Sequence, residues 1–327
     1  MSLRSPLTIP KLHKPARLQS GDTVALIAPA SPADSAEAQV EIQNKLTTLG
    51  YTTKLGKNVH ERLGFLAGTD AARLRDVHDA FSCTESGAVL CVRGGYGSGR
   101  IINSIDFKKL KDNPKVFVGS SDLTTMLNGC LLHAGLTAFH GPTMQSLSDR
   151  SSPEFTLNSW MRQISGDSEA LGSIKKGCPA DELQVEVLQT GTASGRLLGG
   201  NLAVLLSSLG TPFFPSLDDS ILFLEDIGET PFRIDRNLTH LLNTGALDKV
   251  RGFALGVFER CAYRPDDAVK KQSLRDVVID RLVPLGKPVV LGLPFGHTAY
   301  NATLPVGTTV TLDGKNGDLL IEELGVR

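Results

Sequence analysis

The sequence lacks several features that would place it in a common class of protein. None of its apolar runs approaches the roughly 18 residues that a membrane-spanning helix needs. Its first 22 residues carry charges but no apolar stretch of the kind found in a secretory signal. There is no basic block, and the formal net charge is only −1, so the charge pattern of a nucleic-acid-binding protein is missing. We therefore expect a soluble cytoplasmic protein with neither membrane nor nucleic acid among its partners.

Patterns for metals and disulfides are missing as well. The five cysteines are scattered and odd in number, no C-x-x-C or H-E-x-x-H occurs, and the seven histidines do not pair at ligand spacing. Three of the cysteines lie inside apolar runs, which favours buried free thiols in a reducing compartment. The sequence therefore predicts no metal site and no cofactor.

What the chain does contain is an alternation of short apolar runs with amphipathic segments. Runs at 23–29, 88–92 and 116–118 are bounded by turn residues and predict buried strands, whereas 70–81 and 267–282 predict helices. Strands that are apolar throughout and alternate with helices belong to a parallel sheet covered on both faces. Sites in such sheets lie at the carboxyl ends of the strands.

The chain length favours about two domains. Residues 166–193 are polar, rich in Gly, Ser, Lys and Glu, and have no firm period. We interpret them as a linker. An N-terminal α/β domain is then expected at 1–165 and a C-terminal β/α domain at 194–327.

Residues 115–128 (KVFVGSSDLTTMLN) predict a short strand, an abrupt turn at Gly119 and an immediate helix. Ser121 on that turn would face the free amides and the positive end of the helix, which could stabilise an oxyanion. The arrangement is similar to a nucleophile elbow, G-x-S-x-G, but the last glycine is missing. The alternative is that Ser120 or Ser121 caps the helix, with Asp122 as a first-turn acid.

Residues 93–97 (RGGYG), here called the glycine turn, follow the predicted strand at 88–92. Three glycines in this turn would let the backbone approach a ligand closely. The spacing matches neither G-x-G-x-x-G nor the Walker motif, which argues against a phosphate loop. An ordinary tight turn remains an alternative.

Three polar residues follow apolar strands in the chain order Ser121, Glu225, His297. Together they could supply a hydroxyl nucleophile, a carboxylate and a base. Taken singly, Glu225 could be a capping or surface acid, and His297 an ordinary turn histidine. The order is that of the α/β-hydrolases, although the spacing fits them poorly. The residues alone leave a serine hydrolase and unrelated structural roles both open.

The chain also resembles the LD-carboxypeptidase family, serine peptidases that trim murein peptides, and their relatives that confer immunity to microcin C. The motifs that carry this resemblance span nearly the whole chain: 21–31 (GDTVALIAPAS), 93–97 (RGGYG), 119–122 (GSSD), 140–142 (HGP), 199–202 (GGNL), 224–229 (LEDIGE), 233–236 (RIDR) and 292–297 (GLPFGH).

The resemblance implies a nucleophile at Ser121, a triad acid at Glu225 and a base at His297, with Glu229 as the residue that could be mistaken for the acid. It also implies an N-terminal domain similar to class I glutamine amidotransferases, a smaller C-terminal β/α domain, an active site in the groove between them, and a homodimer.

The reaction we expect is release of the terminal D-alanine from murein tetrapeptide by cleavage after meso-diaminopimelate or L-lysine. The backbone amides of Gly95 and Asp122 would bind the oxyanion. Arg93 could bind the substrate carboxylate, or it could form a structural ion pair.

Two other functions stay open. One is a microcin C-type amidase, which would need an aromatic surface for the adenine. Residues 166–193 contain no aromatic residue, and Trp160, the only tryptophan, lies in an amphipathic segment that favours core packing. The other is a non-catalytic binding module that has kept the fold.

Overall fold

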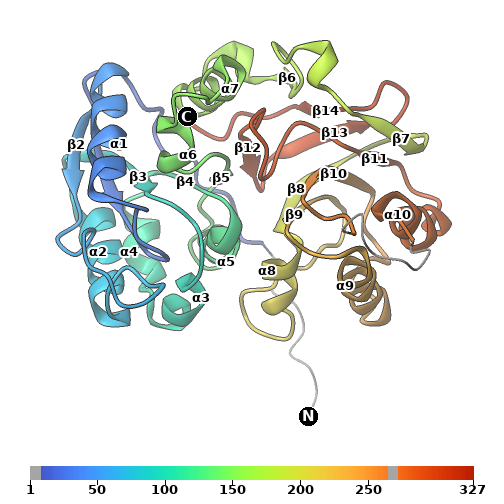
Figure 1. The fold of residues 1–327 in the computed structure, drawn as a ribbon, viewed down its shortest axis with the longest axis horizontal. Helices are drawn as coiled ribbons and strands as arrows, with labels where there is room; N and C mark the ends of the chain where they lie inside the picture. The colour runs from blue at the N-terminus through green and yellow to red at the C-terminus, as the bar shows by residue number, and fades with distance from the viewer. Residues whose placement is uncertain (1–8, 264–271) are drawn as a thin grey trace.

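The computed structural model describes residues 9–263 and 272–327, which form two units side by side, each built on its own β-sheet (Figure 1). The strands of the first sheet are β1 (Thr23–Ile27), β2 (Thr52–Leu55), β3 (Ser86–Cys91), β4 (Val116–Gly119), β5 (Ala138–His140) and β12 (Leu304–Val306). Their order across the sheet is β12-β5-β4-β3-β1-β2, and all pairs are parallel except β12 with β5.

The second sheet has eight strands in the order β6-β14-β13-β8-β9-β10-β11-β7. They are β6 (Gly172–Ser173), β7 (Glu186–Gln189), β8 (Thr192–Asn201), β9 (Ser220–Ile227), β10 (Gly252–Glu259), β11 (Val289–Leu291), β13 (Thr309–Asp313) and β14 (Asp318–Ile321). The four central strands from β8 to β11 are parallel, whereas β7, β13, β14 and β6 each pair with their neighbours in antiparallel fashion.

The helices are α1 (Ala36–Thr48), α2 (Asp70–Ser82), α3 (Ser98–Ile101), α4 (Phe107–Asp112), α5 (Thr124–Gly129), α6 (Met144–Ser148), α7 (Glu154–Ser165), α8 (Leu202–Ser207), α9 (Pro231–Asn243) and α10 (Leu274–Leu282). Short 3₁₀ turns lie at Ile102–Ser104, Ser121–Leu123, Ser168–Ala170, Ala180–Glu182 and Val283–Leu285, and a π-helical turn at Cys130–Ala134. Among the described residues no helix has the length and apolar character to span a bilayer.

The first sheet is buried on both faces, as the apolar strands predicted. Successive residues of β3 alternate between two cores, with Leu90 in the core formed with α1, α6 and α7 and Val89 in the core formed with α2, α4 and α5. The Trp160 side chain is fully buried in the first of these cores, with its ring 6.4 Å from that of Tyr51. The core role expected for Trp160 is therefore confirmed.

The predicted strands and the helix at 70–81 agree with β1, β3, β4 and α2 to within two residues at each end. Thr69 caps α2 by accepting a hydrogen bond from the amide of Ala72 at 3.2 Å. The predicted helix at 267–282 is observed as α10 from Leu274, and positions 267–271 of that prediction lie outside the described residues.

Two features differ from the expected division of the chain. Residues 166–193, interpreted as a linker, contribute β6 and β7 to the edges of the second sheet. These strands are short and only half-buried, so they lack the apolar pattern that identifies an interior strand. In addition, β12 lies beyond residue 194 but joins the first sheet, because the chain returns to pair with β5. The domain limits at 165 and 193 stay a prediction.

Candidate active site

Ser121 lies on the sharp turn between β4 and the helix that follows. Its φ is +60°, one of three positive values among the described non-glycine residues, and such a backbone costs about 1–3 kcal/mol. The turn is crowded on the other side: a Cβ on Gly94 would lie 2.8 Å from Ser121 Cβ. Glycine at position 94 thus lets the glycine turn approach the serine closely.

The helix-cap alternative for these serines is met in position but not in hydrogen bonding. Ser120 stands at the N-cap of the 3₁₀ turn Ser121–Leu123 and makes no capping hydrogen bond through its side chain. Within the described part of the chain, the Ser121 hydroxyl also has no hydrogen-bond partner, and the residue is partly exposed. The hydroxyl is therefore available to a substrate.

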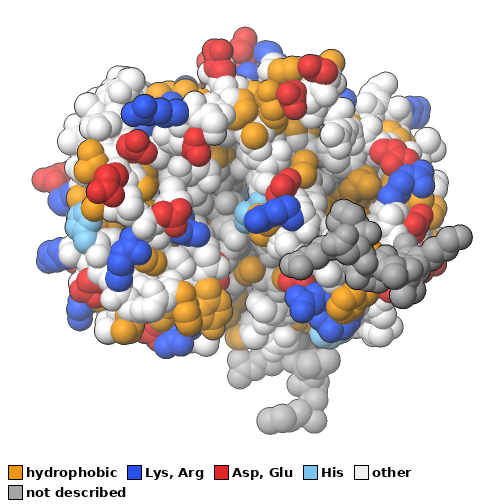
Figure 2. Space-filling view, in the orientation of Figure 1, with side chains coloured by type: hydrophobic (Ala, Val, Ile, Leu, Met, Phe, Trp, Pro, Cys, Tyr) orange, Lys and Arg blue, Asp and Glu red, His pale blue; other side chains and the backbone are white. Residues whose placement is uncertain are grey.

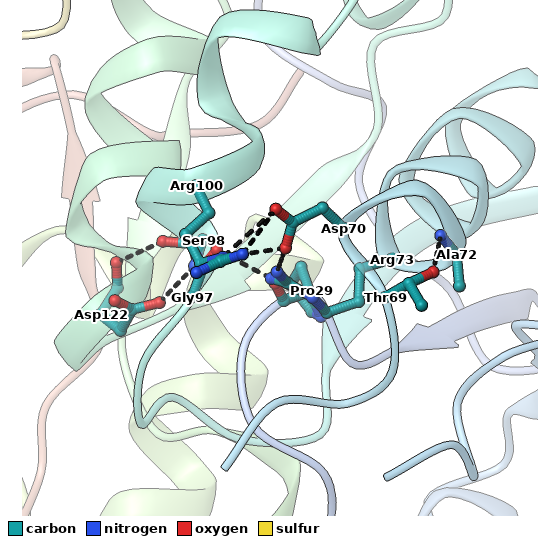
Figure 3. A network of polar contacts seen from close by, with 9 residues as sticks. All are labelled: Pro29, Thr69, Asp70, Ala72, Arg73, Gly97, Ser98, Arg100 and Asp122. Carbon is teal, nitrogen blue, oxygen red and sulfur yellow. Dashed lines mark hydrogen bonds and ion pairs between the residues drawn. The ribbon is translucent and has the colours of Figure 1, made fainter. Parts of the chain in front are cut away.

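Asp122 is the first-turn acid that the alternative expected, and it also contacts the residue that follows the glycine turn. Its buried carboxylate accepts a hydrogen bond from the amide of Ser98 at 2.8 Å, and its carbonyl accepts one from the Ser98 hydroxyl at 2.7 Å (Figure 3). Since Ser98 directly follows the glycine turn, Asp122 ties that turn to the serine.

A buried arginine holds the backbone of the glycine turn through hydrogen bonds to carbonyl groups. The Arg73 guanidinium donates to the carbonyls of Gly97 at 2.7 Å and Pro29 at 2.5 Å, and it pairs with Asp70 (Figure 3). Asp70 also pairs with Arg100, which lowers the pKa of the Asp70 carboxyl. The network fixes the backbone of the turn that was expected to contribute the Gly95 amide.

Arg93, the expected carboxylate ligand, is already paired. Its guanidinium contacts the carboxylate of Asp34, whose other oxygen accepts a hydrogen bond from Gln145 at 2.6 Å. The structure thus shows the ion pair that the sequence left as an alternative. Substrate binding by Arg93 stays a prediction and would require a carboxylate to compete with Asp34.

Glu225 and His297 meet although 72 residues separate them. Glu225 lies near the end of β9 with its side chain fully buried, and its Oε2 is 2.5 Å from His297 Nδ1. Gly296 makes this approach possible: its φ is +109°, and a Cβ there would lie 2.8 Å from Glu225 Cβ.

The environment of His297 favours its charged form. Burial by itself lowers the pKa of His297, but the hydrogen bond that His297 donates to Glu225 and the negative charge of that carboxylate outweigh it. The pKa of His297 is therefore raised above its ordinary value of 6.5.

The two acids that neighbour Glu225, Asp226 and Glu229, bind other groups than His297. Glu229 lies 3.4 Å from Arg233 on the first turn of α9. The buried Asp226 carboxylate accepts hydrogen bonds at 3.0 Å from the Asn201 side chain and the Ala203 amide, while burial raises the pKa of Asp226 to about 6. Of these three carboxylates, only Glu225 contacts His297.

The serine and the Glu225–His297 pair lie where the two sheets meet. Gly119 at the end of β4 pairs with His140, and His140 Nε2 is 4.0 Å from Glu225 Oε1. On β8, the Asn201 amide donates to the Thr124 hydroxyl at 3.1 Å, just past the serine turn. Figure 2 shows the molecule hollowed between its two halves.

His297 borders two cavities. One, of about 320 Å³, is lined by residues from both units, including Ser120, Pro142 and Gly296. The other, of about 630 Å³, lies on the second unit, with Glu182 and Tyr300 in its wall. Two open spaces therefore adjoin His297.

The two units also correspond to two described family domains. The LD-carboxypeptidase N-terminal domain matches residues 24–141, and the LD-carboxypeptidase C-terminal domain matches residues 194–312. The chain belongs to the LD-carboxypeptidase family. Ser121 lies in the first matched range, and Glu225 and His297 lie in the second.

Similar proteins agree with this membership. A probable murein peptide carboxypeptidase of Bacillus subtilis is 36% identical, with 95% of this chain and 94% of that protein covered. The crystal structure of muramoyltetrapeptide carboxypeptidase from Oxalobacter formigenes matches with a TM-score of 0.78 at 30% identity, covering 91% and 97% of the two chains.

MccF, in a structure with glutamyl sulfamoyl guanosine, matches with a TM-score of 0.85 at 22% identity, covering 96% of this chain and 99% of that one. At this identity, the MccF likeness shows a shared two-domain α/β fold.

Some residues that support the site of this LD-carboxypeptidase family member could not be identified from any pattern in the sequence. Thr156 on α7 donates to the Ala299 carbonyl at 2.6 Å and accepts from the Asn301 amide at 2.9 Å. The Asn301 side chain in turn accepts from the Gly296 amide at 3.1 Å. Hydroxyl and amide residues in loops are too common for their spacing to reveal such contacts.

Proposed function

We propose that this protein is a serine-type LD-carboxypeptidase that releases the terminal D-alanine of murein tetrapeptide, cleaving after the L-centre of meso-diaminopimelate or L-lysine. The observation that carries the proposal is the 2.5 Å contact between His297 Nδ1 and Glu225, at the same junction of sheets as the strained turn of Ser121. Relatives named for murein peptide cleavage supply the substrate class.

In the proposed reaction, the Ser121 hydroxyl attacks the carbonyl carbon of the scissile amide while His297 Nε2 takes its proton. The imidazolium, stabilised by Glu225, then gives a proton to the leaving amine of D-alanine. Water attacks the acyl-enzyme by the same proton route and restores the Ser121 hydroxyl.

We assign oxyanion binding to the backbone amides of Asp122 and Gly95. In support, Gly94 packs against Ser121, and Ser98 joins the glycine turn to Asp122. The proposal includes a cytoplasmic location and no cofactor, as the composition and the missing motifs predict, and a homodimer, as the family resemblance implies. Sedimentation of the purified protein would test the dimer.

The pH dependence of kcat/KM is expected to show an acid limb with an apparent pKa above 6.5. The raised pKa of His297 means that imidazole is protonated, and cannot accept the Ser121 proton, below that value. Activity should therefore rise as pH increases through this pKa. Initial rates of D-alanine release at low substrate concentration, measured from pH 5 to pH 9, provide the test. A rate constant that is flat across pH 6–8 would contradict a catalytic base at His297.

A second candidate, an amidase acting on aminoacyl or peptidyl nucleotides, is favoured by one specific observation. Tyr96 in the glycine turn and Phe65 are exposed, and their rings lie 5.5 Å apart in an edge-to-face arrangement. This pair offers an aromatic surface outside residues 166–193, where the sequence has none. A base could stack on it, with a free energy of roughly 1–3 kcal/mol.

We nevertheless expect the tetrapeptide to be the better substrate, with little or no hydrolysis of nucleotidyl peptides. The test compares kcat/KM for murein tetrapeptide and for an aminoacyl sulfamoyl nucleoside in one buffer. A nucleotidyl substrate preferred by about tenfold or more would establish the second candidate. If Tyr96→Ala then abolished this preference for the nucleotidyl substrate, the base would be shown to stack on the aromatic pair.

A further inference from the structure

His140 is a buried histidine with no assigned role. It ends β5 and begins the HGP motif, and its side chain is 0% exposed. Neither of its ring nitrogens has a hydrogen-bond partner among the described residues, and the same holds for Oε1 of Glu225. These unpartnered groups face each other, with 4.0 Å between His140 Nε2 and Glu225 Oε1.

The strands and an aromatic ring hold His140 in this orientation. The backbone of His140 pairs with Gly119 on one side and Leu304 on the other. Its ring packs edge-on against Phe223, with the centroids 5.2 Å apart. Phe223 and Glu225 are two residues apart on β9, so both side chains point to the same face of the strand. The ring that contacts Phe223 is thereby directed toward Glu225.

A buried polar group without a partner costs free energy, whereas a donor and an acceptor that meet satisfy each other. The 4.0 Å separation must shorten by about 1 Å to give an ordinary N–H···O hydrogen bond. Rotation of the Glu225 carboxylate or of the imidazole supplies such a shift without moving a strand.

We propose that His140 is a positioning residue that donates its Nε2–H to Oε1 of Glu225 and so keeps Oε2 directed at His297. The inference rests on the proposed function, because it assigns a partner to the proposed triad acid. The donor must be a neutral imidazole, and burial lowers the pKa of His140 to about 4 despite the charge of Glu225. At neutral pH the ring therefore carries one proton.

This contact also moderates the basicity of His297. A donor on Oε1 withdraws negative charge from Oε2, so the imidazolium of His297 is stabilised less than by an isolated carboxylate. Besides Glu225, the charged groups that shift the pKa of His297 are Asp226 and Arg260. The charged groups that shift the pKa of His140 are Glu225 and His297. Loss of the donor should raise the pKa of His297.

The first test uses the wild-type protein. Nitrogen-15 NMR of histidine-labelled enzyme, with His140 assigned by its absence in His140→Gln, reports which ring nitrogen is protonated. The proposal expects protonation at Nε2 and none at Nδ1 between pH 6 and pH 8. A His140 ring protonated at Nδ1 alone, or at both nitrogens, would overturn it.

The second test compares two substitutions of similar length, His140→Gln and His140→Met. Glutamine keeps an N–H donor near the position of Nε2, and methionine does not. We expect His140→Met to lose about tenfold or more in kcat with little change in KM, and to shift the acid limb of kcat/KM upward. His140→Gln should retain the greater part of kcat and the wild-type limb.

A purely structural role predicts equal losses in both variants and an unmoved acid limb, and that result would overturn the proposal. If the methionine variant does not fold, the protonation state measured in the wild type still decides. Wild-type enzyme that releases no D-alanine would refute the proposed function instead, so the two failures are distinguishable.

Discussion

Replacing Ser121 with alanine is expected to lower kcat for D-alanine release by about 1,000-fold or more, with KM nearly unchanged. Removing the attacking oxygen eliminates the acyl-enzyme route, and only binding and oxyanion stabilisation remain to assist water. Alanine at φ +60° keeps the strain of the turn, so the fold and the cavity should persist. Release of D-alanine from murein tetrapeptide, followed by chromatography, measures the effect.

Ser120→Ala is the matched control for this experiment. Ser120 is the adjacent serine, lines the same cavity as His297 and has an extended backbone. Its loss should change kcat by about threefold at most, since its hydroxyl is not at the strained position. Equal release by wild type and Ser121→Ala would refute the serine mechanism. A severe loss of kcat in Ser120→Ala alone would assign the nucleophile to Ser120 in place of Ser121.

Replacing Glu225 with glutamine is expected to reduce kcat by about 1,000- to 10,000-fold while leaving KM largely intact. The amide has nearly the same shape as the carboxylate, but it carries no charge to stabilise the imidazolium of His297. If its NH₂ group faces Nδ1, the amide also imposes the wrong tautomer on the imidazole. Full kinetic curves on the tetrapeptide, together with thermal unfolding, separate lost catalysis from lost folding.

Glu229→Gln provides the control, because Glu229 is the other glutamate of the same motif. Its carboxylate lies 3.4 Å from Arg233 in a partly exposed ion pair, and such pairs contribute little. We expect less than about threefold change in kcat. If Glu229→Gln is the damaging substitution and Glu225→Gln is mild, the triad acid has been misassigned.

The apolar strands of the first unit could be predicted from sequence because burial on both faces leaves a pattern within the strand's own residues. A strand covered on both faces needs apolar side chains at every position, which is what β3 and β4 contain. Edge strands need no such pattern. For this reason the residues of β6 and β7 have the sequence pattern of a linker, and no pattern in the sequence predicts the return of β12 to the first sheet.

The site shows the same contrast between features set by adjacent residues and contacts between residues far apart in the sequence. The glycine and serines of the 119–122 motif, placed directly after an apolar strand, predict a sharp turn, since the conformation of a turn depends mainly on adjacent residues. Whether Arg93 meets a substrate or Asp34 depends on a contact between two separate loops. Spacing along the chain contains no information about such a contact.

By itself, the sequence therefore determined the alternating α/β pattern of the first unit, the position of the serine turn and, through its motifs, the family. Only the tertiary structure showed that Glu225, the acid that the resemblance implied, contacts His297 directly, that Asp122 and Arg73 hold the glycine turn, and that His140 lies beside Glu225. The physical reason is that strands and turns follow from neighbouring residues, whereas side-chain pairs across two sheets depend on how the whole chain packs. Hydrogen bonds and buried charges are set by distances of a few ångströms, and those distances exist only in the folded molecule.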